Sequence, residues 1–187
     1  MRRANDFYPT ESAVTKVLVE KVSALSMAKT ILEPCAGDGA ISNIFRNMGI
    51  DVTTNDIDLN HSTNYDDCAK VRTNWEKWQE ENGAFDWVIT NPPFNQAHAI
   101  LPFAYEYSQV GVAFLLRLSY LEPAQNRGEW LRSHSSKLTN LIILGQPRPS
   151  FTGNGGTDSC TVAWMVWRKE PRTDTDTIVD FVTNWKN

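Results

Sequence analysis

The tetrapeptide Asn91-Pro92-Pro93-Phe94 directly follows an apolar run, Trp87-Val88-Ile89. Such a run is typical of a buried strand, and the two prolines end it in a stiff loop because each fixes its φ angle at about −65°. This loop holds the side-chain amide of Asn91 and the carbonyl of Pro92 in one orientation, next to the ring of Phe94. Two hydrogen-bond acceptors and a ring face can therefore meet one planar ligand. A purely structural turn is the weaker interpretation, because a given tetrapeptide arises by chance in roughly one in a thousand chains of this length.

The length and composition are those of a single domain that needs no disulfide or structural metal. Its 187 residues suffice for one hydrophobic core, so we expect a single domain over 1–187. The three cysteines have no CxxC spacing and the three histidines are scattered, so we expect no metal site. No signal-like or membrane-spanning apolar stretch occurs, which indicates a cytoplasmic protein without membrane contact. The net charge of −4 restricts any nucleic-acid contact to a local patch.

Apolar runs and helical periods alternate along the chain, and this alternation predicts an α/β fold with a parallel sheet flanked by helices. The expected strands are 30–32, 52–54, 85–90, 111–118, 138–144 and 161–167. Apolar residues at helical spacing predict helices over 13–25, 40–48 and 97–107. A Thr- and Asp-rich linker at 173–177 leads to a further segment, 178–185, whose apolar spacing predicts a C-terminal helix.

A glycine-rich loop, Glu33-Pro34-Cys35-Ala36-Gly37-Asp38-Gly39, follows the first expected strand and precedes a helix. Open α/β sheets bind their ligands at this position, outside the carboxyl ends of the strands. Glycines there allow the backbone to come close to a ligand. The carboxylate of Glu33 argues against a phosphate ligand, which prefers N–H groups without an acidic neighbour. A role in packing alone stays open as the alternative for this loop.

An acidic residue, Asp56, closes the second expected strand. It follows Glu33 by about 20 residues, the separation at which a carboxylate in such folds binds ribose hydroxyls. One carboxylate can accept both hydroxyl hydrogens. The alternative is that Asp56 or Asp58 only caps the turn that follows the strand.

These motifs together resemble the S-adenosylmethionine-dependent amino-methyltransferases of the N6-adenine DNA methyltransferase type. The resemblance rests on the loop 33–39, on Asn55-Asp56-Ile57-Asp58, and on Asn91-Pro92-Pro93-Phe94, which matches the family's catalytic tetrapeptide in full. It implies a Rossmann-like class I methyltransferase fold with a mostly parallel, seven-stranded sheet, and S-adenosylmethionine as the cofactor. It assigns catalysis to Asn91, Pro92, Pro93 and Phe94, and cofactor binding to Glu33, Pro34, Cys35, Ala36, Gly37, Asp38, Gly39, Asp56 and Ile57.

Two weaker elements extend this resemblance. A Phe/Tyr-containing segment precedes the first helix in the family as Phe7-Tyr8-Pro9-Thr10 does here, which implies that Tyr8 and Thr10 touch the methionine end of the cofactor. Thr73-Asn74-Trp75 stands where the family has an acidic and aromatic pair, which implies that Asn74 and Trp75 bind the cofactor's adenine. Because an amide replaces the acid, Asp66 or Asp67 is the alternative adenine contact.

The resemblance implies methyl transfer to the N6 amino group of adenine in DNA, with the base unpaired or flipped out of a duplex. The Asn91 oxygen and the Pro92 carbonyl would accept the two amino hydrogens, and Phe94 would stack on the base. The order of the motifs is that of the class whose target-recognition domain follows the catalytic domain. Only a short tail follows residue 167 here, so we expect a minimal form without that domain.

Basic and aromatic residues alternate after the catalytic strand, and Arg117, Arg127 and Arg148 are the expected nucleic-acid contacts. An ordinary charged surface is the alternative there. The same tetrapeptide would also suit an adenine in RNA or a glutamine side chain in a protein. A non-catalytic cofactor-binding subunit is the alternative from outside the enzymes.

Overall fold

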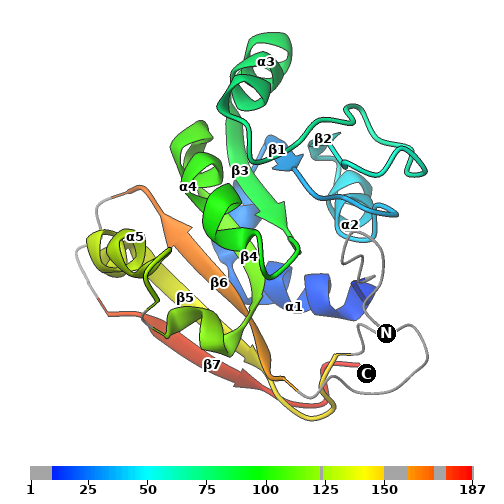
Figure 1. Cartoon of the computed structure of the whole chain (residues 1–187). Coiled ribbons are helices and arrows are strands. Elements are labelled where there is room, and N and C mark those ends of the chain that lie inside the picture. Colours follow the sequence, from blue (N-terminus) through cyan, green and yellow to red (C-terminus); the bar gives the residue numbers. More distant parts are fainter. Residues whose placement is uncertain (1–9, 123, 150–159, 171–175, 187) are drawn as a thin grey trace.

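A computed structural model describes residues 10–122, 124–149, 160–170 and 176–186, and seven strands within them form one sheet (Figure 1). The order of the strands across the sheet is β2-β1-β3-β4-β6-β5-β7. The strands are β1 (Thr30–Glu33), β2 (Asp51–Thr54), β3 (Phe85–Thr90), β4 (Ser108–Arg117), β5 (Leu138–Leu144), β6 (Val162–Arg168) and β7 (Ile178–Val182).

Only β6 runs against the other described strands, because it pairs antiparallel with both β4 and β5. All other neighbouring pairs are parallel, including β5 with β7. The expected α/β fold with a mostly parallel, seven-stranded sheet is therefore confirmed. None of the described helices is both long enough and apolar enough to cross a membrane.

Helices cover both faces of this sheet (Figure 1). One face packs on α1 (Ser12–Lys21), the 3-10 turn η2 (Ser23–Met27) and α2 (Ser42–Asn47). The opposite face packs on α3 (Arg72–Asn82), α4 (Ala97–Tyr107) and α5 (Gly128–Ser133). Two further 3-10 turns, η3 (Leu118–Leu121) and η4 (Ser135–Lys137), flank α5. The result is a three-layer arrangement of helices, sheet and helices.

The apolar run in β4 is continuous because both of its faces are buried. Leu115 packs in the core on the α1 side, whereas Leu116 packs in the core on the α4 side. The same alternation continues in β6, where Trp164 faces α1 and its indole N–H donates to the carbonyl of Val14 at 2.9 Å. Successive side chains of a strand point to opposite faces, so two separate cores share one sheet.

The prediction of a C-terminal helix over 178–185 is wrong. Residues Ile178–Val182 form β7, which pairs in parallel with β5. Their apolar spacing suits a helix, but the outer edge of β5 offers backbone N–H and C=O groups that an added strand satisfies. Phe181 is 76% exposed on this strand, whereas Trp185 beyond it is buried and its indole N–H donates to the carbonyl of Pro147 at 2.7 Å.

The chain reverses its direction of travel across the sheet at β1. From β1 it moves outward to β2, and it then returns to place β3 on the other side of β1. The loops after β1 and β3 therefore leave the sheet at the same edge in opposite directions. A crevice opens at such a switch point, and ligands of open α/β sheets bind in it.

Candidate active site

The loop after β1 turns at two glycines with positive φ angles, Gly37 (53°) and Gly39 (79°). Only glycine adopts such angles without strain. Asp56, which follows β2, holds this loop: one carboxylate oxygen accepts the N–H of Gly37 at 2.7 Å, and the other accepts the N–H of Asp58 at 2.9 Å. The carboxylate of Asp56 is therefore fixed in orientation at the edge of the crevice.

Glu33, the last residue of β1, is buried with 1% of its surface exposed. Its carboxylate accepts the backbone N–H of Ser42 at the start of α2, at 2.8 Å. Burial raises the pKa of Glu33 well above its ordinary value of 4.5, and the bond from Ser42 opposes this rise without cancelling it. The bond between Glu33 and Ser42 thus joins the end of β1, where the glycine-rich loop begins, to the start of α2, which follows this loop.

Asn55 joins two walls of the crevice, although its own side chain is fully buried. Its amide nitrogen donates to the carbonyls of Pro34 at 2.9 Å and of Asp67 at 3.0 Å, and its amide oxygen accepts the N–H of Asp67 at 2.8 Å. Its backbone also bonds to Glu33 and Ala36. One amide therefore sets the spacing between the loop after β1 and the segment that leads to α3.

The loop after β3 presents Asn91. The amide nitrogen of Asn91 donates to the hydroxyl of Thr10 at 3.1 Å, so the amide oxygen lies on the opposite side of the group. The carbonyl of Pro93 accepts the N–H groups of Gln96 and Ala97 and so starts α4. By contrast, the carbonyl of Pro92 has no hydrogen-bond donor within the described parts of the chain.

Phe94 already has a partner on its ring. The guanidinium carbon of Arg117, at the end of β4, lies over the ring at 5.0 Å from its centroid. The half-buried ring also packs against both hydrophobic cores. The expected stacking of an acceptor base on Phe94 therefore requires a rearrangement at Arg117.

A pocket at the switch point collects most of the residues that the sequence analysis assigned to the site. The predicted residues that line it are Thr10, Glu33, Pro34, Cys35, Ala36, Gly37, Asp38, Asp56, Ile57, Asn91 and Pro93. Gly39, Pro92 and Phe94 belong to the same loops without lining the pocket, and Tyr8 lies outside the described residues.

The structure does not bring Asn74 and Trp75 into this pocket. Both lie in the first turn of α3, where Trp75 turns into the core and is 1% exposed. The indole N–H of Trp75 donates to the carbonyl of Ala69 at 2.8 Å, and the amide of Asn74 donates to that of Cys68 at 3.0 Å. Asn74 and Trp75 thus bond to the backbone of Cys68 and Ala69, two residues that line the pocket. The adenine contact predicted for Asn74 and Trp75 would therefore fall to the lining residues.

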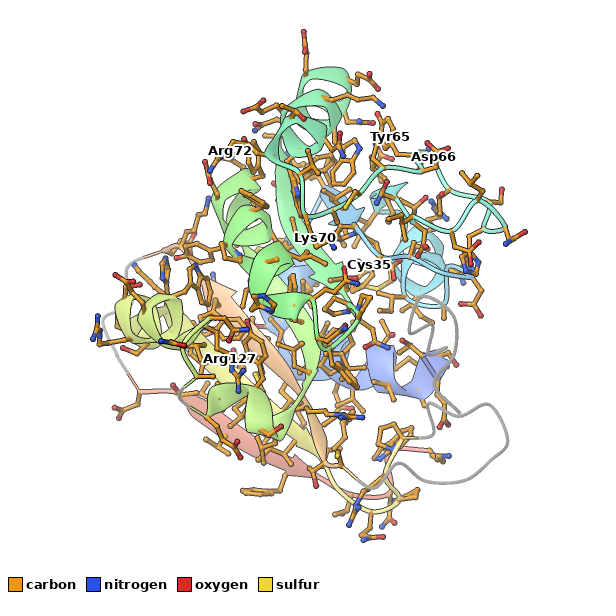
Figure 2. The ribbon with its side chains drawn as sticks, viewed as in Figure 1. Cys35, Tyr65, Asp66, Lys70, Arg72 and Arg127 are labelled. Carbon is orange, nitrogen blue, oxygen red and sulfur yellow. The ribbon has the colours of Figure 1, made fainter. Side chains whose placement is uncertain are left out.

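Asp67, one of the two alternatives for that contact, does line the pocket, whereas Asp66 does not. The carboxylate of Asp67 accepts from Lys77 at 3.1 Å and from the indole of Trp78 at 3.0 Å, both on α3. The pocket is also lined by Asp58, which belongs to the motif 55–58, and by residues that no sequence motif predicted, namely Ala40, Ile41, His61, Cys68, Ala69, Lys70, Gln96 and Ile100. Figure 2 shows Lys70 beside Cys35, although 35 positions separate them.

Acidic side chains outnumber basic ones in the pocket lining. Five carboxyl side chains line it, and Lys70 is its one lysine or arginine among the described residues. These carboxyl groups belong to Glu33, Asp38, Asp56, Asp58 and Asp67. Such a lining favours a ligand with positive charge and opposes a chain of phosphates. Burial also raises the pKa of the Cys35 thiol, so that this thiol stays protonated near neutral pH.

The three arginines expected to contact nucleic acid have different surroundings. Arg117 covers Phe94, as described above. The guanidinium of Arg127 donates to the carbonyls of Tyr120 at 2.7 Å and Ser119 at 3.1 Å, and it lies apart from Cys35 in Figure 2. Arg148 is half-buried in the segment after β5. The bonds of Arg127 indicate a structural role in holding η3.

The arrangement of elements is shared, at low sequence identity, with solved methyltransferases and with a restriction endonuclease. The methyltransferase subunit of a type I restriction-modification system from Streptococcus thermophilus matches 98% of this chain and 48% of its own at 16% identity, with a TM-score of 0.67. The type IIG restriction endonuclease BpuSI matches 86% of this chain and 25% of its own at 14% identity, with a TM-score of 0.59. An O-methyltransferase from Bacillus cereus, solved with SAH, matches 90% and 84% at 15% identity, with a TM-score of 0.53.

The fold is that of the class I methyltransferases. No protein-family model matches the sequence, and no curated protein shows significant sequence similarity to it. The chain spans about half the length of the Streptococcus thermophilus subunit and of a similar structure, the modification subunit of a putative type I restriction enzyme from Vibrio vulnificus.

Proposed function

We propose that this chain transfers a methyl group from S-adenosylmethionine to the N6 amino group of adenine in DNA. The observation that carries the proposal is the position of Asn91. Asn91 directly follows the carboxyl end of β3 and lines the same pocket as the loop after β1. A methyl donor in that pocket and an amino group at Asn91 would therefore be neighbours. The likeness of the fold to restriction-modification proteins supports DNA as the substrate.

The residues present fit S-adenosylmethionine. Asp56, held by two backbone N–H groups, suits ribose hydroxyls, and Ile57 offers an apolar surface beside it for the adenine ring. Glu33, Gly37 and Thr10 would surround the remainder of the cofactor. When bound, the cofactor supplies a methyl group on a sulfonium cation. The excess of carboxyl groups in the lining suits that positive charge.

Hydrogen-bond acceptors activate an amino group whose lone pair is delocalised into an aromatic ring. The Asn91 oxygen and the Pro92 carbonyl would each accept one N–H, which favours a tetrahedral nitrogen as positive charge develops on it. The Thr10 hydroxyl orients the Asn91 amide, and the proline pair holds the Pro92 carbonyl. Neither acceptor is a base near neutral pH, so the proton leaves to water after the transfer. Fixed positioning of donor and acceptor contributes up to about 7–11 kcal/mol to the lowering of the barrier.

Mass-spectrometric nucleoside analysis tests the reaction. The purified chain is incubated with S-adenosylmethionine and, in parallel, with DNA, RNA and unrelated protein. We expect N6-methyladenine in the DNA. Methylation of RNA or of a glutamine side chain alone would move the assignment to that substrate. Cofactor binding without any methyl transfer would favour a non-catalytic subunit.

Asn91→Ala is the diagnostic variant, and Asn95→Ala is its matched control. Asn95 is exposed in the following turn and does not line the pocket. We expect Asn91→Ala to lower kcat by roughly a hundredfold or more, the effect of removing one preorganised polar group. Its affinity for S-adenosylmethionine, measured by calorimetry, should stay close to that of the wild type. Loss of cofactor binding in Asn91→Ala would assign Asn91 to the cofactor instead of the acceptor.

A further inference from the structure

Arg117 stands on the acceptor side of the site. It ends β4, the neighbour of β3, and Phe114 of β4 pairs with Thr90, the residue before Asn91. Leu115 packs in the α1-side core, so Arg117, two positions on, projects to the same face of the sheet. Asn91 reaches that face as well, since its amide bonds to Thr10 next to α1.

The guanidinium of Arg117 occupies the place that an incoming base needs on Phe94. It lies over the ring, and the ring packs against both cores, so little ring surface is left for a base. A contact between a cation and a ring is comparable in strength to the stacking of one base on an aromatic side chain. A base can therefore replace the guanidinium on the Phe94 ring at little cost in free energy.

We propose that Arg117, displaced from the Phe94 ring by the incoming base, binds a phosphate of the acceptor nucleotide. This inference rests on the proposed methyl transfer and names a residue that would hold the polynucleotide beside the methylated base. A guanidinium binds phosphate through two parallel N–H donors, whereas a glutamine side chain offers no negative charge. In the free protein, Arg117 shields Phe94. In the complex, it pairs with the phosphate backbone beside the bound base.

The distribution of charge supports separate binding regions for the cofactor and for the polynucleotide. The cofactor pocket is lined by carboxyl groups, and Arg117 is not part of that lining. A polynucleotide is repelled by the first region and attracted by the second. Arg127 lies at η3, where its guanidinium donates to the carbonyls of Tyr120 and Ser119, and among the described residues it makes no contact with Phe94.

Binding of a fluorescein-labelled, single-stranded oligodeoxynucleotide as a function of salt tests the inference. Anisotropy is measured in the presence of S-adenosylhomocysteine for wild type, Arg117→Gln, Arg117→Lys and Arg132→Gln. Arg132 is an exposed arginine on α5, so its variant has the same loss of charge away from Phe94. We expect Arg117→Gln to raise Kd about tenfold and to lower the slope of log K against log salt by about 0.7, the share of one phosphate in a single strand. Arg117→Lys should restore most of the slope, and Arg132→Gln should change neither quantity.

The outcomes separate this inference from the reaction itself. An unchanged Kd and slope in Arg117→Gln, or a wild-type protein that does not bind the oligonucleotide, overturns the phosphate contact. Loss of cofactor affinity and of thermal stability in both Arg117 variants overturns it too, because it shows a structural role. A wild-type protein whose oligonucleotide binding depends on Arg117, but which methylates no adenine, retains the contact and refutes the reaction.

Discussion

The amide of Asn91 donates to the hydroxyl of Thr10 at 3.1 Å, and this bond joins the loop after β3 to the residue two positions ahead of α1. Thr10 is nearly buried at 9% exposure. The bond decides which end of the amide faces Thr10 and therefore which end faces an acceptor. The resemblance assigned Thr10 to cofactor binding. Thr10 thus also orients the Asn91 amide, which we propose activates the amino group of the acceptor.

Replacing Thr10 by valine should impair turnover more than folding. Valine keeps the shape of threonine but cannot accept the N–H of Asn91, so the amide loses its preferred orientation. One hydrogen bond contributes about 0.5–1.5 kcal/mol, so kcat should fall by up to roughly tenfold. Steady-state kinetics check the value, and Thr10→Ser, which keeps the hydroxyl, should recover most of it. Equal losses in both variants would show that the hydroxyl does not matter.

Asn55→Ala should destabilise the protein and weaken cofactor binding together. The change removes three side-chain hydrogen bonds and leaves the buried carbonyl of Pro34 without that donor. An unsatisfied buried group costs about 1–3 kcal/mol, and we expect a total loss of at least about 2 kcal/mol in urea unfolding. Asn60→Ala is the control, because Asn60 is exposed and, among the described residues, its side chain bonds only to Asp58. A stable Asn55→Ala variant with loosened cofactor binding would separate the two effects.

Glu33 makes stability depend on pH. Because burial raises its pKa above 4.5, the folded protein keeps the Glu33 proton at pH values where the unfolded chain has lost it. The stability that Glu33 contributes is therefore fully present below about pH 4.5 and is lost as pH rises through the raised pKa. Glu33→Gln still accepts the Ser42 N–H but does not titrate, so its stability relative to wild type should increase with pH above 4.5.

Urea unfolding of Glu33→Gln at a series of pH values provides the measurement. Glu20→Gln, a change at an exposed carboxylate on α1, serves as the control and should show no such trend. A difference between wild type and Glu33→Gln that stays constant over the whole pH range would contradict the raised pKa.

Gly111 of β4 pairs with Arg168 of β6 and leaves no room for a side chain. A Cβ atom at Gly111 would lie 2.4 Å from the carbonyl oxygen of Trp167 and 3.1 Å from the ring of Trp87. Gly111→Ala should therefore force the strands apart and cost about 1–3 kcal/mol, as overpacking does in other cores. Gly128→Ala is the matched control, since a Cβ there meets nothing within 4 Å. Thermal unfolding should show a lower Tm for the first variant only.

Strands that are buried on both faces were predictable because short runs of apolar and β-branched residues, bounded by turn residues, favour buried strands. Six expected strands coincide with β1 to β6, and the loops that follow β1, β2 and β3 contain most of the predicted pocket residues. Each of these loops is attached to a strand end, so the order of strands determines where it lies. The sequence motifs and the order of the strands therefore predict the same location for the site, at the carboxyl ends of β1, β2 and β3.

Elements whose surroundings come from distant residues were not predictable in the same way. The segment 178–182 has an apolar pattern that suits a helix, and only the open edge of β5 makes it a strand. Trp75 resembles an adenine-stacking residue in sequence, but the core formed by Trp78, Phe103 and Tyr107 takes up its ring. Lys70 and Gln96 carry no motif, and they enter the pocket only because the loops around them meet there.

The hydrogen bonds of Asn55 go to backbone groups rather than to side chains. The side chains of Pro34 and Asp67 can therefore change without breaking these bonds, provided that residue 55 stays able to donate and accept. A bond from a side chain to a backbone group restricts the residue type at one position, whereas a bond between two side chains restricts it at two. The bonds of Asn55 therefore offer a physical reason why a chain can keep the outline of a distant methyltransferase subunit at a sequence identity of 16%.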